Sequence, residues 1–173
     1  QEKIINIYGF SKVVKVVPGG QERYHSVYRG LAALTEIMNR DGVVLIHDGA
    51  RPLVTRDIIG RTLEEAREYG ACVAAMPVKD TIKVADGKGF ADHTPDRSTL
   101  WQIQTPQAFQ YELVFDAYEK LLSDESRQKG ITDDAMVVET MAFKQVKLTE
   151  GSYENIKVTT PEDMKIAECL LRG

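Results

Sequence analysis

The sequence has few cysteines, no long apolar run and no cluster of basic residues. Its two cysteines, Cys72 and Cys169, lie far apart, without the CxxC or Cys/His spacing that a zinc site requires. No run approaches the roughly 18 apolar residues of a membrane-spanning helix, and no signal-peptide pattern opens the chain. The 22 basic residues are scattered among 26 acidic ones, for a net charge of −4. We therefore expect a cytoplasmic protein that binds neither membranes nor nucleic acid.

The length of 173 residues and the 43% hydrophobic content predict a single domain spanning 1–173, with a core of ordinary proportions. The chain begins at Gln1 without an initiator methionine. We therefore expect this domain to be N-terminally incomplete.

Short apolar or β-branched runs alternate with segments of helical periodicity. The predicted strands are Val13–Val17, Val43–Ile46, Ala71–Val78, Leu100–Thr105 and Gln145–Leu148. The predicted helices are Tyr24–Met38, Thr55–Gly70, Tyr111–Leu122, a helix capped by Thr132-Asp133-Asp134 that runs to about Met141, and the segment that follows Thr160. Because parallel neighbours need crossover connections, this alternation predicts an α/β fold with a mostly parallel sheet and helices on both faces. Ligands bind such sheets beyond the carboxyl ends of the strands.

The region 80–99 interrupts this alternation. Residues Thr81–Val84 and Phe90–Thr94 flank the glycine-containing segment Asp86–Gly89, a pattern typical of a β-hairpin. A lone hairpin is marginally stable in water, so we expect it to pack on another subunit. The hairpin therefore indicates a dimer.

Asp48 follows the apolar run Val43–Ile46 and precedes Gly49, so its carboxylate should emerge at a strand end where a ligand can approach the backbone. Such an oxygen can bind a hard divalent cation that bridges phosphates, or it can simply cap the following turn. Arg51, three residues further on, can bind a phosphate or pair with Asp48. The spacing alone leaves these alternatives open.

Other candidate ligand-binding residues are weaker when each is taken alone. Gly19-Gly20-Gln21, followed by Ser26, offers amides and a hydroxyl at a helix start. Lys157 is either a phosphate clamp or a surface lysine with a buried stem, and Arg97 is either a phosphate ligand or a plain surface residue. The histidines, at positions 25, 47 and 93, have no evident triad partners, and no GxSxG motif is present. Acyl-transfer chemistry is therefore not expected.

The order of these segments resembles a known family. The segments are Gly19–Arg23 with Ser26-Val27, His47–Pro52, Pro77–Lys83, Asp96-Arg97 with Leu100-Trp101, Gln104–Phe109, Thr132–Ala135, and Asn155–Thr159 with Pro161–Asp163. Together they are similar to the 2-C-methyl-D-erythritol 4-phosphate cytidylyltransferases. The resemblance implies a Rossmann-like sheet and transfer of CMP from CTP to methylerythritol phosphate, with Mg²⁺ and release of pyrophosphate.

The resemblance also implies residue roles. Asp48 would bind the metal, and Lys157 and Arg97 would be the catalytic residues that position the substrate phosphate. The nucleotide-binding residues would be Gly19, Gly20, Gln21, Ser26, Asp48, Gly49 and Arg51, and the substrate-binding residues would be Thr81, Arg97, Lys157, Arg51 and Thr159. The β-hairpin at 80–99 would be a dimerisation arm, so Thr81 and Arg97 would serve the partner subunit's site.

Two departures from the family pattern bear on these expectations. The family's glycine-rich N-terminal loop, with its arginine and lysine, has no counterpart in this sequence, so the chain is expected to be inactive on its own. Gly49 stands where many members carry alanine, a change that a backbone contact tolerates. Two alternatives stay open: a ribitol-phosphate cytidylyltransferase, and a non-catalytic dimeric module that binds a nucleotide or a sugar phosphate.

Overall fold

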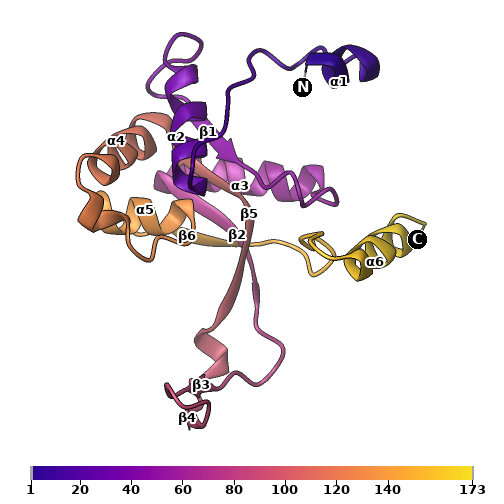
Figure 1. The fold of residues 1–173 in the computed structure, drawn as a ribbon, viewed down its shortest axis with the longest axis vertical. Coiled ribbons are helices and arrows are strands. Elements are labelled where there is room, and N and C mark those ends of the chain that lie inside the picture. The colour runs from indigo at the N-terminus through magenta and orange to yellow at the C-terminus, as the bar shows by residue number, and fades with distance from the viewer. Residues whose placement is uncertain (1, 173) are drawn as a thin grey trace. The chain divides into compact units, whose positions relative to one another are not determined.

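The computed structural model describes residues 2–172 (Figure 1). It divides into two compact units. The first comprises the residues up to Val44 together with Gln110–Lys144, and the second comprises Leu45–Phe109 together with the residues from Gln145 onward. None of the helices within residues 2–172 is both long enough and apolar enough to cross a membrane.

The first unit is helical. Its helices are α1 (Glu2–Tyr8), α2 (Arg23–Leu34), α4 (Tyr111–Leu122), the 3₁₀ turn η2 (Glu125–Gln128) and α5 (Asp134–Met141). Helix α4 packs against both α2 and α5, and Val114, Tyr118 and Leu121 are buried along it. The hydroxyl of Tyr111 donates to the main-chain oxygen of Leu31 at 3.0 Å. These contacts put the core of the unit along one face of α4.

A buried carboxylate lies inside this helical unit. Asp134 is fully buried at the start of α5 and receives hydrogen bonds from the guanidinium of Arg23 and from the hydroxyl of Tyr118. Burial, followed by the Asp134 charge, raises the pKa of Tyr118 above its usual range. Because Arg23 begins α2 and Tyr118 lies on α4, this cluster ties three helices together.

The main sheet has the strand order β1-β5-β2-β6. The strands are β1 (Val43–Ile46), β2 (Ala71–Pro77), β5 (Trp101–Gln110) and β6 (Lys147–Glu150). Strand β2 is antiparallel to β5, with Ala71 opposite Phe109, and parallel to β6, with Cys72 opposite Lys147. The apolar side chains of β2 are buried as far as Met76. This strand is therefore the core of the second unit.

Helix α3 (Arg56–Tyr69) packs against β2 and β6. The side chain of Thr55 caps its start by accepting from the amide of Ile58 at 3.3 Å. Gly70 ends it with a φ of +88°, a left-handed conformation that glycine adopts without a steric penalty. These signals confirm the predicted helix between Thr55 and Gly70.

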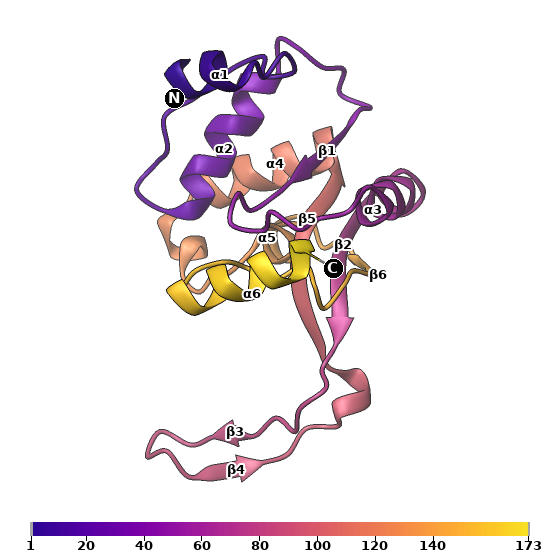
Figure 2. The same ribbon diagram turned by 90° about the vertical axis from the view of Figure 1, so that its right-hand side faces the viewer.

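The predicted hairpin is present and leaves the main sheet. Strands β3 (Val84–Ala85) and β4 (Ala91–His93) pair with each other, and the 3₁₀ turn η1 (Arg97–Thr99) leads back to β5. Figure 2 shows the hairpin at the far end of two long segments of the chain, one leaving β2 and the other returning to β5. The strands are shorter than predicted, since only this small part of each side pairs.

The last helix, α6 (Pro161–Arg172), begins as the sequence predicts. Thr160 Oγ1 accepts from the amide of Asp163 at 3.2 Å, and Asp163 Oδ2 in turn accepts from the amides of Thr159 and Thr160. These hydrogen bonds from main-chain amides lower the pKa of the Asp163 carboxyl below its usual range. The helix start is thus a reciprocal cap.

Four sequence predictions differ from the structure. Val13–Val17 is not a strand: it pairs with no strand among residues 2–172, and Val14 is 76% exposed. Helix α2 ends at Leu34 rather than Met38, where the hydroxyl of Thr35 donates to the main-chain oxygen of Ala32. Strand β5 is much longer than Leu100–Thr105, and β6 begins two residues later than predicted. The first two show that β-branched and periodic patterns need tertiary partners to become regular structure.

Candidate phosphate-binding site

Three charged side chains meet where β1 ends, and we call Asp48, Arg51 and Lys157 the Asp48 cluster. The carboxylate Oδ2 of Asp48 lies 3.0 Å from Lys157 Nζ and 3.8 Å from Arg51 Nε. The side chains of Asp48 and Arg51 are 20% and 13% exposed, whereas that of Lys157 is 48% exposed. One negative and two positive charges therefore share a small, partly covered volume with an open side at Lys157.

Arg51 is held firmly within this cluster. Its Nη1 donates to the main-chain oxygen of Asn155 at 2.7 Å, and its amide donates to the main-chain oxygen of Asp48 at 3.0 Å, which closes a turn. Its Nε is buried without a hydrogen-bond partner in the described part of the chain. Burial lowers the pKa of Arg51 and the Asp48 charge raises it, but a guanidinium stays charged at neutral pH.

Asn155 is the buried centre of the surrounding hydrogen bonds. Its side chain is fully buried, and Nδ2 donates to Gln104 Oε1 at 3.1 Å and to the main-chain oxygen of Thr105 at 2.9 Å. A β-carbon at Gly151 would lie 2.4 Å from the same Gln104 oxygen. This tight packing fixes the loop after β6, which carries Lys157, against β5.

The main chain at Asp48 is fixed by a second set of bonds. Its amide donates to Thr105 Oγ1 at 3.0 Å, and the same oxygen lies 3.0 Å from Nδ1 of His47. The other ring nitrogen of His47 lies 3.0 Å from the main-chain oxygen of Arg51. The amide of Val158 donates to the main-chain oxygen of Ala50 at 2.7 Å, which ties the Lys157 segment to the same turn.

The remaining predicted residues near this cluster have definite places. Gly49 follows Asp48 directly, and a β-carbon there would meet nothing within 4 Å, which agrees with alanine being tolerated. Thr159 lies two residues beyond Lys157, and its hydroxyl donates to Asp163 Oδ2 at 3.1 Å. The structure therefore brings Asp48, Gly49 and Arg51 together with the segment Lys157–Thr159.

The predicted nucleotide loop lies in the first unit, at the start of α2. The amide of Gly20 donates to Ser26 Oγ at 2.9 Å, and a β-carbon at Gly20 would lie 2.2 Å from that of His25, so only glycine fits there. The main-chain oxygen of Gly19 accepts from Arg29 Nη1 at 2.6 Å. Gln21 follows at an exposed position. The hydroxyl of Ser26 thus supports the loop internally.

Thr81 and Arg97 lie at the base of the hairpin, in the second unit. Thr81 is exposed, and Arg97 Nη1 donates to the main-chain oxygen of Lys79 at 2.9 Å. Lys79 Nζ lies 3.3 Å from the centre of the Tyr153 ring, a cation–π contact. The Tyr153 hydroxyl also donates to the main-chain oxygen of Pro77 at 2.8 Å. The hairpin base is therefore attached to the loop that carries Asn155.

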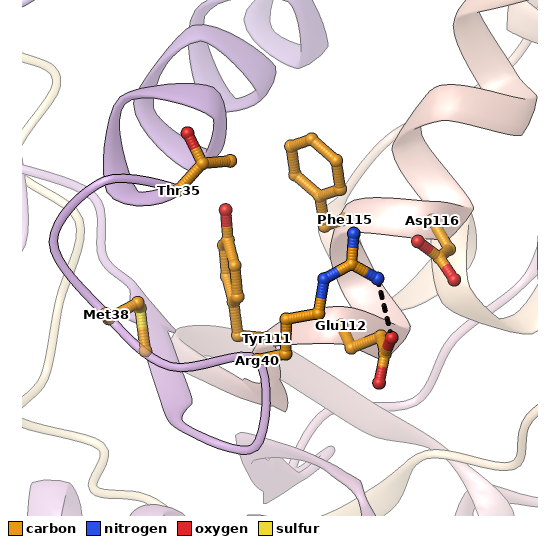
Figure 3. Close-up of a pocket in the computed structure, with 7 residues that line it drawn as sticks. All are labelled: Thr35, Met38, Arg40, Tyr111, Glu112, Phe115 and Asp116. Carbon is orange, nitrogen blue, oxygen red and sulfur yellow. Dashed lines mark hydrogen bonds and ion pairs between the residues drawn. The ribbon is translucent and has the colours of Figure 1, made fainter.

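A separate pocket lies in the first unit between the end of α2 and the start of α4 (Figure 3). Its cavity measures about 170 Å³ and is lined by Thr35, Met38, Arg40, Tyr111, Glu112, Phe115 and Asp116. Arg40 and Glu112 pair across its rim at 2.7 Å. None of the predicted site residues lines it, so this hollow is not the predicted site.

The donor set at Asp48 suits a metal that arrives with phosphates. Among residues 2–172, no group of three or more His, Cys, Asp or Glu side chains is placed to hold a metal ion. Mg²⁺ is commonly bound through one or two carboxylates plus substrate phosphates and water. A partly exposed carboxylate beside two cationic side chains that attract phosphate fits this mode.

Sequence reasoning missed the residues that hold the cluster in place. Thr105 lies 57 residues from Asp48, and Asn155 lies 51 residues from Gln104, so no local spacing connects them. His47 has no triad partner, yet its ring bridges two segments of the site. The polar residues Gln104, Thr105 and Gln107 within β5 are the one sequence signal for this network.

The fold is a mixed sheet with helices, and a carboxylate, an arginine and a lysine lie together beside the end of one strand. This arrangement is typical of α/β enzymes that bind phosphate-bearing ligands. Comparison with known proteins identifies the family. The family model described as 2-C-methyl-D-erythritol 4-phosphate cytidylyltransferase matches residues 1–173. The chain therefore belongs to the 2-C-methyl-D-erythritol 4-phosphate cytidylyltransferase family, whose name is that of a nucleotidyltransferase.

Individual relatives agree. The 2-C-methyl-D-erythritol 4-phosphate cytidylyltransferase of Alkaliphilus oremlandii is 49% identical over 172 residues, which cover 99% of this chain and 70% of that protein. The protein of the same name from Lachnospira eligens is 50% identical over 164 residues, covering 95% of this chain and 70% of that one.

Solved structures carry the same fold. The 4-diphosphocytidyl-2C-methyl-D-erythritol synthase of Anaerococcus prevotii has a TM-score of 0.87 at 35% identity, covering 99% of this chain and 74% of that one. The cytidylyltransferase of Thermus thermophilus has a TM-score of 0.77 at 34% identity, covering 91% and 72%. The predicted α/β fold and family resemblance are thereby confirmed.

Proposed function

We propose that the Asp48 cluster is the metal and phosphate corner of a site that transfers CMP from CTP to 2-C-methyl-D-erythritol 4-phosphate. The reaction releases pyrophosphate and supplies isoprenoid precursor synthesis. The observation that carries the proposal is the meeting of Asp48, Arg51 and Lys157 within hydrogen-bonded backbone, in a chain that belongs to this family.

The chemistry asks for positioning and charge neutralisation. An oxygen of the methylerythritol phosphate attacks the α-phosphorus of CTP, a new P–O bond forms, and the bond from the α-phosphorus to the bridging oxygen breaks with pyrophosphate as the leaving group. The attacking phosphate is already ionised near neutral pH, so no general base is required. Lys157 and Arg97 are the proposed catalytic residues, because two anions approach each other and cationic groups stabilise that approach.

Asp48 is the proposed metal ligand. A bound Mg²⁺ would neutralise phosphate charge and orient the triphosphate. Lys157 now pairs with Asp48 at 3.0 Å, and its 48% exposed side chain is able to turn toward a phosphate once that carboxylate is engaged. Arg51 is clamped by the Asn155 main-chain oxygen, so it offers a fixed charge at the same place.

Each unit, taken by itself, contains proposed nucleotide-binding residues. In the second unit, Gly49 contributes backbone that a ligand can approach closely, beside Asp48 and Arg51. In the first unit, Gly19, Gly20, Gln21 and Ser26 are the proposed nucleotide-binding residues, in a loop that the Gly20–Ser26 hydrogen bond holds at the start of α2, where helix N-termini favour anions. Thr159 completes the set of substrate-binding residues proposed in the second unit, and we propose that both units act as one nucleotidyltransferase domain.

We further propose a homodimer formed through the arm at 80–99, with Thr81 and Arg97 serving the partner subunit's site. The arm exposes apolar side chains that a partner would cover, since Phe90 is 71% exposed and Val84 is 39% exposed. A cytoplasmic location is part of the proposal, because an exposed free thiol such as Cys169 stays reduced there.

The test is substrate selectivity. Because the chain covers 70% of the Alkaliphilus relative, turnover is measured on the chain itself and on the chain joined to the part of that relative it does not cover. Pyrophosphate release with CTP and Mg²⁺ is compared for methylerythritol phosphate and ribitol phosphate. Faster release with methylerythritol phosphate is expected in the joined protein. Faster release with ribitol phosphate, or none with either substrate, overturns the proposal.

A further inference from the structure

His47 closes the turn that carries Asp48 and Arg51 from both ends. One ring nitrogen, Nε2, lies 3.0 Å from the main-chain oxygen of Arg51, and the other, Nδ1, lies 3.0 Å from Thr105 Oγ1. The same Thr105 oxygen accepts from the amide of Asp48 at 3.0 Å. The ring therefore joins the first residue of the turn to its last, through a hydroxyl on β5.

Counting protons along this ring determines its tautomer. The carbonyl of Arg51 can only accept, so Nε2 must carry a hydrogen. In the Nε2–H tautomer Nδ1 is an acceptor, and the hydroxyl of Thr105 has one hydrogen to donate to it. The lone pairs of that hydroxyl receive the Asp48 amide. Every donor meets an acceptor in this arrangement.

The other tautomer matches these partners less well. The Nδ1–H tautomer would turn a bare Nε2 toward the Arg51 carbonyl, which places two acceptors 3.0 Å apart. It would also give Thr105 Oγ1 two N–H donors and leave the hydrogen of that hydroxyl facing neither. Thr105 is 4% exposed, so little water is available to take that hydrogen.

We propose that His47, which joins the Arg51 carbonyl to the Asp48 amide through the hydroxyl of Thr105, is a positioning residue for the Asp48 cluster. This inference rests on the proposed function for what the cluster binds. His47 acts through main-chain groups of the two residues whose side chains bind metal and phosphate, so it sets where the Asp48 carboxylate and the Arg51 guanidinium point. Its own role requires no contact with the ligand.

The first test needs no ligand. Protein labelled with ¹⁵N in histidine is examined near pH 8 by long-range proton–nitrogen correlation, which shows which ring nitrogen carries the hydrogen. The His47→Gln variant, which keeps a donor at the Nε2 position, assigns the signal among the three histidines. We expect the Nε2–H tautomer at His47, and the Nδ1–H tautomer overturns the proposal.

The second test uses a matched pair at Thr105. Thr105→Val keeps the shape and removes the hydroxyl, whereas Thr105→Ser keeps the hydroxyl. We expect Thr105→Val to lose the tautomer preference and the hydrogen-exchange protection of the Asp48 amide, and Thr105→Ser to retain both. Circular dichroism shows whether each variant is folded. If Thr105→Val does not fold, the tautomer of His47 in the wild type still tests the proposed positioning role.

Binding of Mg²⁺·CTP, followed by calorimetry, completes the test. His47 is exposed, so the loss should be that of one ordinary hydrogen bond, on the order of threefold to tenfold weaker binding in Thr105→Val. Thr105→Ser is expected to bind as the wild type does. If the wild-type joined protein binds no Mg²⁺·CTP, the proposed function fails, while the tautomer and the Asp48 amide still test the positioning role. Equal hydrogen-exchange protection of the Asp48 amide in Thr105→Val and Thr105→Ser contradicts the positioning role.

Discussion

Replacing Asn155 with alanine should destabilise the second unit more than any loop substitution on the surface. The side chain is fully buried, and it donates to Gln104 Oε1 at 3.1 Å and to the Thr105 carbonyl at 2.9 Å. Removing a typical hydrogen bond costs about 1 kcal/mol, and leaving a buried acceptor without a donor costs about 1–3 kcal/mol.

Two features of the site reduce the expected loss of stability. Gln104 Oε1 keeps a long hydrogen bond from the amide of Ser152 at 3.4 Å, so the Thr105 carbonyl is the main acceptor left without a donor. Asn155 Oδ1 is itself buried without a hydrogen-bond partner in the described residues, so its removal relieves a penalty. We expect a net loss of about 2–3 kcal/mol in the free energy of unfolding.

Urea unfolding followed by far-UV circular dichroism measures this change. Asn39→Ala is the matched control, because Asn39 is exposed, and it should shift the free energy of unfolding by less than about 0.5 kcal/mol. A loss at Asn155 no larger than at Asn39 would refute the view that Asn155 holds the site together. Asn155→Asp should be least stable at neutral pH and recover at acidic pH, because a buried carboxylate facing two oxygens has a raised pKa.

Three further predictions follow from the same structure. Lys157→Ala should abolish most turnover of the joined protein. It should change the free energy of unfolding by less than about 1 kcal/mol, because the Lys157 side chain is half exposed in its ion pair. The control Lys165→Ala, on the exposed surface of α6, should change neither quantity. Gly20→Ala should destabilise the first unit, because its β-carbon would lie 2.2 Å from that of His25, whereas Gly49→Ala meets open space and should be neutral; thermal unfolding separates them, and equal melting temperatures would contradict the packing. Burial and the Glu65 charge raise the pKa of Cys72 to about 12, so a thiol reagent at pH 8 should modify only the exposed Cys169 until the protein is unfolded. The stability contributed by the protonated Cys72 thiol should also fall as the pH rises above about 9.

The fold was predictable wherever local signals and burial agree. The cap at Thr55 and the left-handed Gly70 delimit α3 as the sequence predicts, and the apolar runs of β1 and β2 are strands. Val13–Val17 has the same β-branched composition but no neighbouring strand among residues 2–172, so it forms no strand and is mostly exposed. Strand formation depends on a partner, which composition does not reveal.

The candidate site was predictable only in part. The charged residues of the Asp48 cluster follow strand ends or precede a helix cap, and the resemblance places them in one series. Their mutual distances depend on the pairing of distant strands, as the 57-residue separation of Thr105 from Asp48 illustrates. Asn155 and His47 act through main-chain groups, and such roles leave no spacing pattern.

The central claim is that the Asp48 cluster binds the metal and phosphates of CTP. The most direct measurement is calorimetric titration of Mg²⁺·CTP into the wild type, Asp48→Asn and Asp57→Asn, the last an exposed aspartate in the first turn of α3. The account predicts that binding weakens at least about tenfold in Asp48→Asn, the scale of one lost charge-assisted contact, and is unchanged in Asp57→Asn. Equal affinities for the wild type and Asp48→Asn would contradict it.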